Sequence, residues 1–199
     1  MQTEINYDTV FDAQEHFRVL LDSMSRPDKI NALPVMDILP PEGLQSSAAL
    51  TGFALLNSDV TYYIAGKNSA GIAEYLLVNT SAQDAEISIA DYIFIPEFFY
   101  GEELYDARVG TAIYPEDSAT IIAQSNLISQ EPQEGAIELI LKGPGVNGEA
   151  KVYISGLSRD LLDFLKIQND EYPLGIDMII TDKANNVMGL PRSNRFAFV

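Results

Sequence analysis

The apolar positions near the start of the chain recur with the period of an α-helix. These positions are Val10, Ala13, Phe17, Leu20, Leu21 and Met24. Spacings of three and four residues place side chains on one side of a helix. Thr9 is a suitable N-cap residue, and Pro27 cannot continue a helix. The pattern therefore predicts a helix from about residue 10 to about residue 25.

Strand-like and helical patterns alternate along the first part of the chain. Strands are predicted at residues 29–33, 60–65, 92–95 and 119–123. Helices are predicted at residues 46–56, 69–78 and 97–109. Ser46 is the expected N-cap of the first of these helices, and Gly101 interrupts the last. The run from Tyr92 to Ile95 is continuously apolar, which is typical of a strand buried on both faces.

The last part of the chain is dominated by hairpin patterns. Residues 136–142 and 149–155 alternate like strands on either side of a glycine-rich turn, which predicts an antiparallel pair. Ser158 is the expected N-cap of a helix that ends near residue 168. Residues 169–195 then predict a second hairpin, whose turn is Asn185-Asn186.

This order of elements indicates the fold class. Helices alternate with strands early in the chain, and hairpins follow late. The sequence therefore favours an α/β fold, a layered α-β-α domain with a mixed sheet. At 199 residues the chain is long enough for one domain with a sizeable core and short for two, so residues 1–199 are expected to form a single domain.

Composition and charge exclude several function classes. The 29 acidic and 12 basic residues give a formal net charge of -17, which repels nucleic acid and anionic lipid. There is no cysteine, so thiolate metal sites and thiol nucleophiles are excluded. No apolar run approaches the length of a membrane span, and the N-terminus has no pattern of an export signal. We expect a cytoplasmic protein that binds neither nucleic acid nor membrane.

Three patterns that could carry cofactor or catalytic chemistry have simpler explanations. The run from Gly143 to Gly148 matches G-x-G-x-x-G, but a strand follows it where a nucleotide-binding turn needs a helix, so a hairpin is expected. His16 is the single histidine, and we expect it to be a partly exposed residue of a helix, without a metal or a catalytic triad. Lys142 and Lys183 end strands or lie in turns, where a Schiff-base cofactor would lack a dry pocket. No cofactor is expected.

The arginines are more informative, because an anionic ligand would need a local exception to the acidic surface. Arg26 follows a helix C-terminus, where a cation meets the helix dipole favourably. Arg192 and Arg195 lie in a polar loop after Pro191. A guanidinium group can bind phosphate or carboxylate, or it can pair with an acidic residue of its own chain or of a partner. Asp177 is expected to be partly buried and therefore to need such a partner.

The segment around Pro191 has a further implication. Proline cannot donate to a sheet ladder, so the strand that ends at Gly189-Leu190-Pro191 should lie at a sheet edge. An apolar edge can be covered by another chain. Four residues are therefore candidates for an interface or an anion site: Arg26, Asp177, Arg192 and Arg195.

Several short segments together resemble the PhnH family, the H subunits of the carbon–phosphorus lyase system. They are residues 10–14, 17–27, 110–111, 114–116, 141–145, Asn169, 173–177 and 189–192, in the order of the family. The residues that act as structural motifs in this comparison are Gly110, Thr111, Pro115, Gly143, Pro144, Gly145, Pro173, Gly175 and Pro191. The sequence departs from the family pattern at Asp28, Ser118 and Ser193-Asn194.

The resemblance implies a homodimer whose fold is similar to that of pyridoxal-phosphate-dependent transferases without the cofactor lysine. It implies assembly with the G, I and J subunits into a core complex. It also implies that, with the G, I and L proteins, the subunit supports formation of ribose 1-methylphosphonate 5-triphosphate from ATP and methylphosphonate. The resemblance supplies no catalytic residue. We therefore expect a non-autonomous subunit with a mainly structural role.

Two alternatives to a purely structural subunit remain open from the sequence. The chain could be an autonomous enzyme acting on a small molecule, or a module that delivers substrate to the complex. Both would bind a phosphonate or nucleotide anion through Arg192 and Arg195, because guanidinium groups suit such anions.

Overall fold

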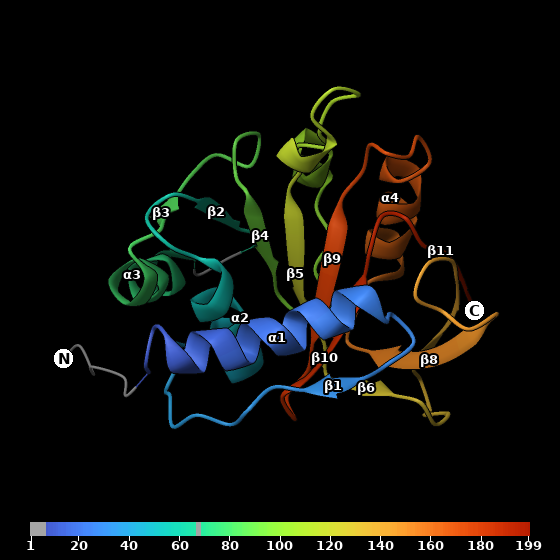
Figure 1. The fold of residues 1–199 in the computed structure, drawn as a ribbon, viewed down its shortest axis with the longest axis horizontal. Coiled ribbons are helices and arrows are strands. Elements are labelled where there is room, and N and C mark those ends of the chain that lie inside the picture. Colours follow the sequence, from blue (N-terminus) through green and yellow to red (C-terminus); the bar gives the residue numbers. More distant parts are fainter. Residues whose placement is uncertain (1–6, 67–68) are drawn as a thin grey trace.

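The computed structural model describes residues 7–66 and 69–199, and a seven-stranded sheet lies at its centre (Figure 1). The strands of this sheet are β1 (Asn31–Ala32), β2 (Thr61–Ile64), β3 (Gln83–Asp84), β4 (Tyr92–Ile95), β5 (Thr120–Gln124), β9 (Asp177–Thr181) and β10 (Asn186–Leu190). A second, four-stranded sheet contains β6 (Leu127–Ser129), β7 (Ile137–Lys142), β8 (Ala150–Ser155) and β11 (Arg195–Phe198). The helices are α1 (Phe11–Ser25), α2 (Ser46–Leu55), α3 (Ser69–Thr80) and α4 (Arg159–Gln168), with 3-10 turns η1 (Glu102–Asp106) and η2 (Pro115–Asp117).

The central sheet is mixed, as the sequence predicts. Its order is β1-β10-β9-β5-β4-β2-β3. The strands from β9 to β3 are parallel to one another, whereas β10 pairs antiparallel with both β9 and β1. The carboxyl ends of the parallel strands therefore meet at one edge of the sheet. The chain leaves β2 towards β3 on one side and leaves β4 towards β5 on the other, so a topological switch point lies between β2 and β4.

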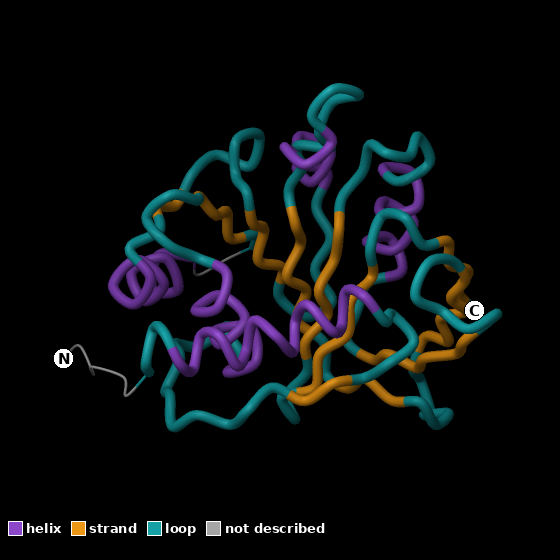
Figure 2. Tube along the Cα trace, in the orientation of Figure 1, coloured by secondary structure: helices purple, strands orange, loops and turns teal. Residues whose placement is uncertain are grey.

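The two faces of the central sheet are covered by different layers, as the colouring in Figure 2 shows. One face packs against α1, α2 and α3 through a cluster that includes Leu50, Leu76 and Phe94. The other face packs against the second sheet and α4 through a cluster that includes Leu139 and Phe164. The expected α-β-α layering is thus correct for one face only, because an antiparallel sheet shares the second face with α4. Strands buried on both faces explain the near-continuous apolar sequences of β4 and β5.

Helix α1 lies where the sequence predicts it, but its N-terminus and its buried face differ. The backbone N–H groups of Val10 and Phe11 donate to the Asp8 carboxylate at 2.8 and 2.9 Å, so Asp8 rather than Thr9 caps the helix. The buried residues are His16, Leu20 and Ser23. Several of the apolar positions that define the helical pattern are exposed: Val10, Phe17 and Leu21.

His16 is fully buried, and the expectation of a partly exposed histidine is wrong. Its Nδ1 lies 2.7 Å from the carbonyl oxygen of Asp12, and its Nε2 lies 3.0 Å from that of Pro34. Both ring nitrogens lie within hydrogen-bonding distance of a backbone carbonyl oxygen, and a neutral imidazole can donate from one of them. This bond lowers the cost of burying the ring. The ring links α1 to the loop that follows β1, and this is a structural role.

Local signals for the later elements are confirmed. The hydroxyl of Ser158 accepts a hydrogen bond from the backbone N–H of Asp160, as expected of the N-cap of α4. Asn185 has a φ of 62° in the turn between β9 and β10, a conformation that asparagine tolerates. Residues 143–148 connect β7 to β8 and form the predicted hairpin instead of a nucleotide-binding turn.

Two other expectations are wrong. Residues 97–109 contain only the 3-10 turn η1, because Gly101 and Ala107 on either side of it are extended. Strand β10 is not at the edge of the sheet, since it lies between β9 and β1. Helix α1 packs closely across it: a Cβ atom on Gly189 would lie 2.6 Å from the carbonyl oxygen of Ser23. The chain covers this strand by itself.

No helix in the described part of the chain is long and apolar enough to cross a membrane. The start of the N-terminal segment in which no export signal is expected, residues 1–6, lies outside the described residues.

Candidate functional site

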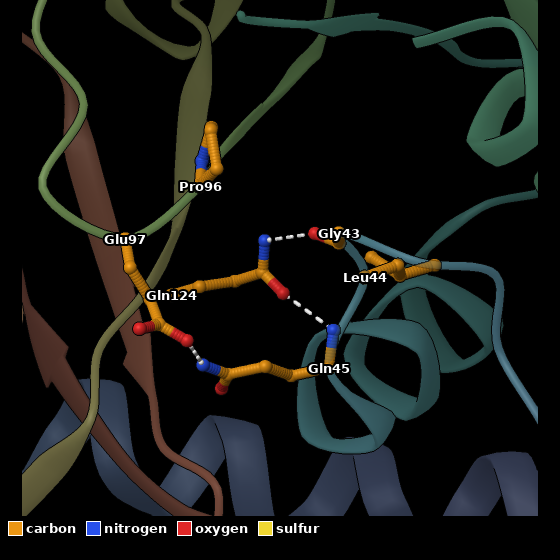
Figure 3. A pocket seen from close by; sticks show the side chains of 6 residues that line it. All are labelled: Gly43, Leu44, Gln45, Pro96, Glu97 and Gln124. Atoms are coloured by element: carbon orange, nitrogen blue, oxygen red, sulfur yellow. Dashed lines mark hydrogen bonds between the residues drawn. The ribbon is translucent and has the colours of Figure 1, made fainter. Parts of the chain in front are cut away.

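A polar pocket lies at the carboxyl ends of β4 and β5, beside the N-terminus of α2 (Figure 3). Its volume is about 290 Å³, and it is lined by Gly43, Leu44, Gln45, Pro96, Glu97 and Gln124. Open α/β sheets bind ligands in the crevice outside the carboxyl ends of their strands, near the switch point. The pocket adjoins β4, one of the two strands that flank this point, so it is the candidate functional site.

Two glutamine side chains form the frame of the pocket (Figure 3). Gln124 extends from the end of β5, accepts the backbone N–H of Gln45 and donates to the carbonyl oxygen of Gly43 at 3.0 Å. Gln45 donates from its Nε2 to Glu97 at 2.7 Å and to the carbonyl oxygen of Ser125 at 2.9 Å. These bonds join the loop before α2 to the ends of both strands, and they fix the positions of both amide groups.

Glu97 is the acidic group of the pocket. Its carboxylate lies 2.9 Å from the ammonium group of Lys183, which also donates to Asn126 at 2.6 Å. Lys183 was expected in a solvated turn; it is 57% exposed, yet its ammonium group is held at the rim of this site. The arrangement offers a carboxylate acceptor and an ammonium donor close together. Such a pair suits a small polar ligand that has both donors and acceptors.

The turn that carries Lys183 is held by the neighbouring Asp182. Asp182 is fully buried, and its carboxylate accepts the backbone N–H groups of Ile128, Ala184 and Asn186 at 2.8–3.0 Å. These three N–H groups offset the cost of burying the carboxylate. Because Ile128 belongs to β6, Asp182 also joins the two sheets.

Asp177 and Arg192 form an ion pair at the opposite end of the sheet. Asp177 begins β9, and its carboxylate accepts the backbone N–H of Arg192 at 2.8 Å and the side-chain Nε at 3.1 Å. The Nη1 of Arg192 donates to the carbonyl oxygen of Pro115 at 2.8 Å. The expectation that an arginine pairs with a partly buried Asp177 is confirmed. Both side chains are largely buried, at 14% and 21% exposed, so Arg192 has little capacity for an external anion.

The motif residues Gly110, Thr111, Pro115 and Gly175 gather around this ion pair. Gly110 has a φ of 78°, and a Cβ atom there would lie 2.6 Å from the carbonyl oxygen of Pro115. Thr111 closes the same loop by accepting the backbone N–H of Tyr114 at 2.9 Å. Gly175 donates its N–H to the carbonyl oxygen of Val109 at 2.9 Å. These contacts hold the backbone segments around the ion pair together.

A second group of motif residues lies around Asn194. The side chain of Asn194 donates to the carbonyl oxygen of Pro144 at 3.0 Å, and a Cβ atom on Gly143 would lie 3.1 Å from its Cα. A Cβ atom on Gly145 would clash with the carbonyl oxygen of Ser25 at the end of α1. The β7–β8 turn therefore needs glycines because two other segments approach it closely. Pro173 follows a cis peptide bond, and Pro191 follows the last residue of β10.

The structure brings together two of the four candidate residues from the sequence, Asp177 and Arg192, but not all four. Arg26 pairs with Asp22 at the end of α1. Arg195 donates to the carbonyl oxygen of Asn169 at 2.6 Å, at the end of α4. Neither lies in the pocket, and the roles expected for these residues at an interface or an anion site remain predictions. Within the described residues, no group of three His, Cys, Asp or Glu side chains could hold a metal ion.

Sequence reasoning did not identify Gln45, Glu97 or Gln124. Gln124 and Glu97 come at the end of apolar runs, and Gln45 precedes Ser46-Ser47 at the start of a helix. These residues can be recognised as site residues only once the order of strands in the sheet is known. Polar side chains that follow two adjacent parallel strands then meet at the carboxyl edge of the sheet.

The fold and the pocket define a class of protein: an α/β protein built on a mostly parallel sheet, with a polar site at the carboxyl ends of its strands. The family described as "Bacterial phosphonate metabolism protein (PhnH)" matches residues 6–197. The chain therefore belongs to the PhnH family, and the resemblance inferred from the short segments is confirmed.

Two relatives carry more specific descriptions. The "Alpha-D-ribose 1-methylphosphonate 5-triphosphate synthase subunit PhnH" of Rhizobium meliloti (strain 1021) is 27% identical over 195 residues, which cover 94% of this chain and 92% of the relative. The "Putative C-P lyase subunit protein HtxG" of Stutzerimonas stutzeri is 26% identical over 184 residues, covering 90% and 83%. Both relatives are described as subunits.

Proposed function

We propose that this chain is a non-autonomous subunit of a carbon–phosphorus lyase system for phosphonate catabolism. One observation carries the proposal: the chain matches the PhnH family over residues 6–197 and matches relatives described as subunits of such enzymes almost from end to end. The reaction would be formation of ribose 1-methylphosphonate 5-triphosphate from ATP and methylphosphonate, so the complex would act as a transferase before the lyase step.

The proposed partners are those that the family resemblance implies. The subunit would form a homodimer and join the G, I and J subunits in a core complex, with the L protein acting alongside. Exposed apolar side chains support an assembly role, because Phe17 and Leu21 on α1 and Val35 and Leu39 in the loop after β1 are 46–79% exposed. Large apolar side chains exposed in this way often mark interaction surfaces.

We also propose that residues 1–199 work as one domain in the cytoplasm, with a fold related to that of pyridoxal-phosphate-dependent transferases. The shared central sheet supports a single domain, since both hydrophobic clusters pack on it. The parallel strands and the pocket at their carboxyl ends support the proposed relation of the fold. Lys183 would not be a cofactor lysine there, because Glu97 and Asn126 engage its ammonium group.

Co-expression tests the subunit role. The chain, with an affinity tag, is produced together with the G, I and J subunits, and the purified material is weighed by native mass spectrometry. We expect a stable assembly that contains all four subunits and two copies of this chain. Recovery of this chain alone, with the other subunits folded and soluble, would refute the proposal.

The pocket supports a second candidate function, delivery of a small substrate within the complex. Arg192 is committed to Asp177, so this function would depend on Gln45, Glu97 and Gln124 rather than on the two arginines. Calorimetric titration of the isolated chain with ATP and with methylphosphonate is the test. Binding that Glu97→Gln weakens and Glu116→Gln leaves unchanged would favour delivery; the absence of heat with either ligand would eliminate it.

A further inference from the structure

Strand β11 is an open edge of the second sheet. The order of this sheet is β11-β7-β8-β6, so β11 has a neighbour on one side only. The backbone N–H of Val199 donates to the carbonyl oxygen of Glu138, in register with the pairs between β11 and β7. Alternation along an antiparallel ladder then directs the N–H and C=O groups of Phe196 and Phe198 away from β7. Within the described residues, these outward groups have no backbone partner outside the sheet.

A groove lies between the start of this edge and the end of α4. The position of α4 beside β11 can be seen in Figure 1. It contains a pocket of about 190 Å³, lined by Lys166, Asn169, Asp170, Asn194, Arg195 and Phe196. The helix supplies one wall and the start of β11 supplies the other. A groove between an edge strand and a helix is one of the arrangements in which proteins bind an extended peptide as an additional strand.

The groove is locally basic on a strongly acidic chain. Lys166 and Arg195 line the pocket, against a single carboxylate from Asp170. The ammonium group of Lys166 lies 5.2 Å from the centre of the Phe198 ring, and the guanidinium group of Arg159 lies 5.8 Å from it. Among the described residues, none of these three cations has a carboxylate within salt-bridge distance, although the net charge is -17.

We propose that β11 binds an extended acidic segment of a partner subunit. The segment adds as a strand to the outward groups of Phe196 and Phe198, and one of its carboxylates lies between Lys166 and Arg195. Backbone pairing supplies affinity, and the two cations select acidic side chains. The inference rests on the proposed role of the chain as a subunit and names the surface and chemistry of one contact.

Charge excludes a second copy of this chain as the occupant. Pairing of two β11 strands about a two-fold axis would place the same surface on both sides of the contact. Lys166, Arg195 and Arg159 of each copy would then face those of the other, and like charges opposite each other are destabilising. An acidic segment removes that repulsion.

Hydrogen exchange in the co-expressed complex tests the contact. The exchange of the Phe196 and Phe198 amides is compared between the isolated chain and the assembly. We expect exchange that is fast in the isolated chain and slower by at least about tenfold in the assembly, since strand pairing protects the amides that it engages. Unchanged exchange of both amides in an intact assembly overturns the proposal and leaves the subunit role standing.

Charge reversal tests the recognition. Lys166→Glu should weaken association with the partner by about tenfold or more. Lys151→Glu, which changes the same charge on β8 of the same sheet, should leave association near that of the unmodified chain. The side chain of Lys166 makes no hydrogen bond or ion pair within the described part of the chain, so its reversal should preserve the far-ultraviolet circular dichroism spectrum. Equal association of both variants overturns the proposal.

A model peptide separates this inference from the proposed function. The probe is an N-acetylated, C-amidated peptide of alternating Glu and Val, and a Lys-Val peptide is its control. Amide signals of Phe196 and Phe198 in nuclear magnetic resonance spectra of the whole chain should shift with the Glu peptide only. If no complex assembles in cells, the peptide titration alone decides. Shifts of the two amide signals with the Glu peptide support β11 as a site for an acidic strand, and the absence of such shifts overturns the proposal.

Methylphosphonate distinguishes a strand site from a site for small anions. If methylphosphonate shifts the signals of Lys166 and Arg195 while the Glu peptide leaves Phe196 and Phe198 unmoved, the groove binds a small anion and the strand proposal is wrong. Shifts with the peptide that methylphosphonate does not displace support the proposal.

Discussion

At the level of single residues, the ion pair of Asp177 and Arg192 illustrates how the C-terminal motif works. One guanidinium group links the start of β9, the segment after β10 and the loop at Pro115. Sequence alone suggested an arginine partner for Asp177, and the structure shows that partner to be fifteen residues away in the same hairpin. One of the two arginines considered for an external anion is thus used to fix the fold.

Removing this guanidinium group should therefore lower stability more than activity. Arg192→Ala leaves the partly buried Asp177 carboxylate and the Pro115 carbonyl group without donors. We expect the free energy of unfolding in urea to fall by about 2–4 kcal/mol. Arg192→Lys keeps the positive charge but lacks the planar guanidinium group with its several donors. Its free energy of unfolding should lie between those of Arg192→Ala and the unmodified chain. A loss below about 0.5 kcal/mol for Arg192→Ala, the usual range of a neutral surface change, would contradict the structural role.

The ion pairs of Asp22 should make the stability of α1 depend on pH in the acid range. Hydrogen bonds from Lys29 and then Arg26 lower the pKa of this carboxyl to about 2 from its ordinary value of 3.8. Because the folded pKa is the lower one, the stabilisation is fully present above about pH 4 and is lost as the pH falls towards 2. A titration of the carboxyl chemical shift checks the pKa. Asp22→Asn should remove the chemical-shift changes of α1 that depend on acid pH. A titration midpoint of the Asp22 carboxyl near its ordinary pKa of 3.8 would contradict its pairing with Lys29 and Arg26.

At the level of elements, the close contact between α1 and β10 depends on a residue without a side chain. A Cβ atom on Gly189 would lie 2.7 Å from the sulfur of Met24 and 2.6 Å from a carbonyl oxygen of the helix. The helix covers β10 at this distance and leaves no room for another chain there. The segment that ends at Pro191 is therefore not an open strand edge, whereas β11 is one of the edge strands.

A pair of glycine substitutions tests this packing. Gly189→Ala should force α1 away from the sheet and cost about 1–3 kcal/mol, as overpacking usually does. Gly71→Ala in α3 meets no atom within 4 Å and should stabilise the chain by about 0.5–1 kcal/mol. Thermal unfolding of both variants is the measurement. If Gly189→Ala were as stable as the unmodified chain, α1 would not approach β10 as closely as the structure has it.

Elements with local signals were predictable, and contacts between distant elements were not. The Ser158 cap and the Asn185 turn depend on residues close to them in the sequence. The contact of Glu97 with Lys183 depends on the order of strands in the sheet. The buried face of α1 was also unpredictable, because His16 is buried only where the Pro34 carbonyl group is available to it.

At the level of the whole molecule, the two hydrophobic clusters lie on opposite faces of one sheet. β4, β5 and β9 contribute alternate side chains to both clusters, for example Ile121 to one and Ile122 to the other. Loss of either layer would expose one face of the same strands. The sequence predicted a mixed sheet within an α/β fold, but not the four-stranded sheet on its second face, because β11 joins that sheet from far along the chain.

Shared strands predict cooperative unfolding. Urea unfolding followed by far-ultraviolet circular dichroism and by tyrosine fluorescence should give superimposable curves, because neither cluster can persist without the central sheet. An intermediate that retains one signal after the other is lost would show that the second sheet and α4 fold separately.

The pairing of β1 with β10 also has a consequence for synthesis on the ribosome. Asn31 pairs with Val187, and β7 pairs with β11 at residues 195–198. An emerging chain therefore cannot complete either sheet until nearly all of these residues have left the exit tunnel. The helices can form as they emerge, but the sheet edges stay unpaired for the time that translation takes. A nascent chain of this kind should be a substrate for holding chaperones, which a protein with mainly local contacts would not need to the same extent.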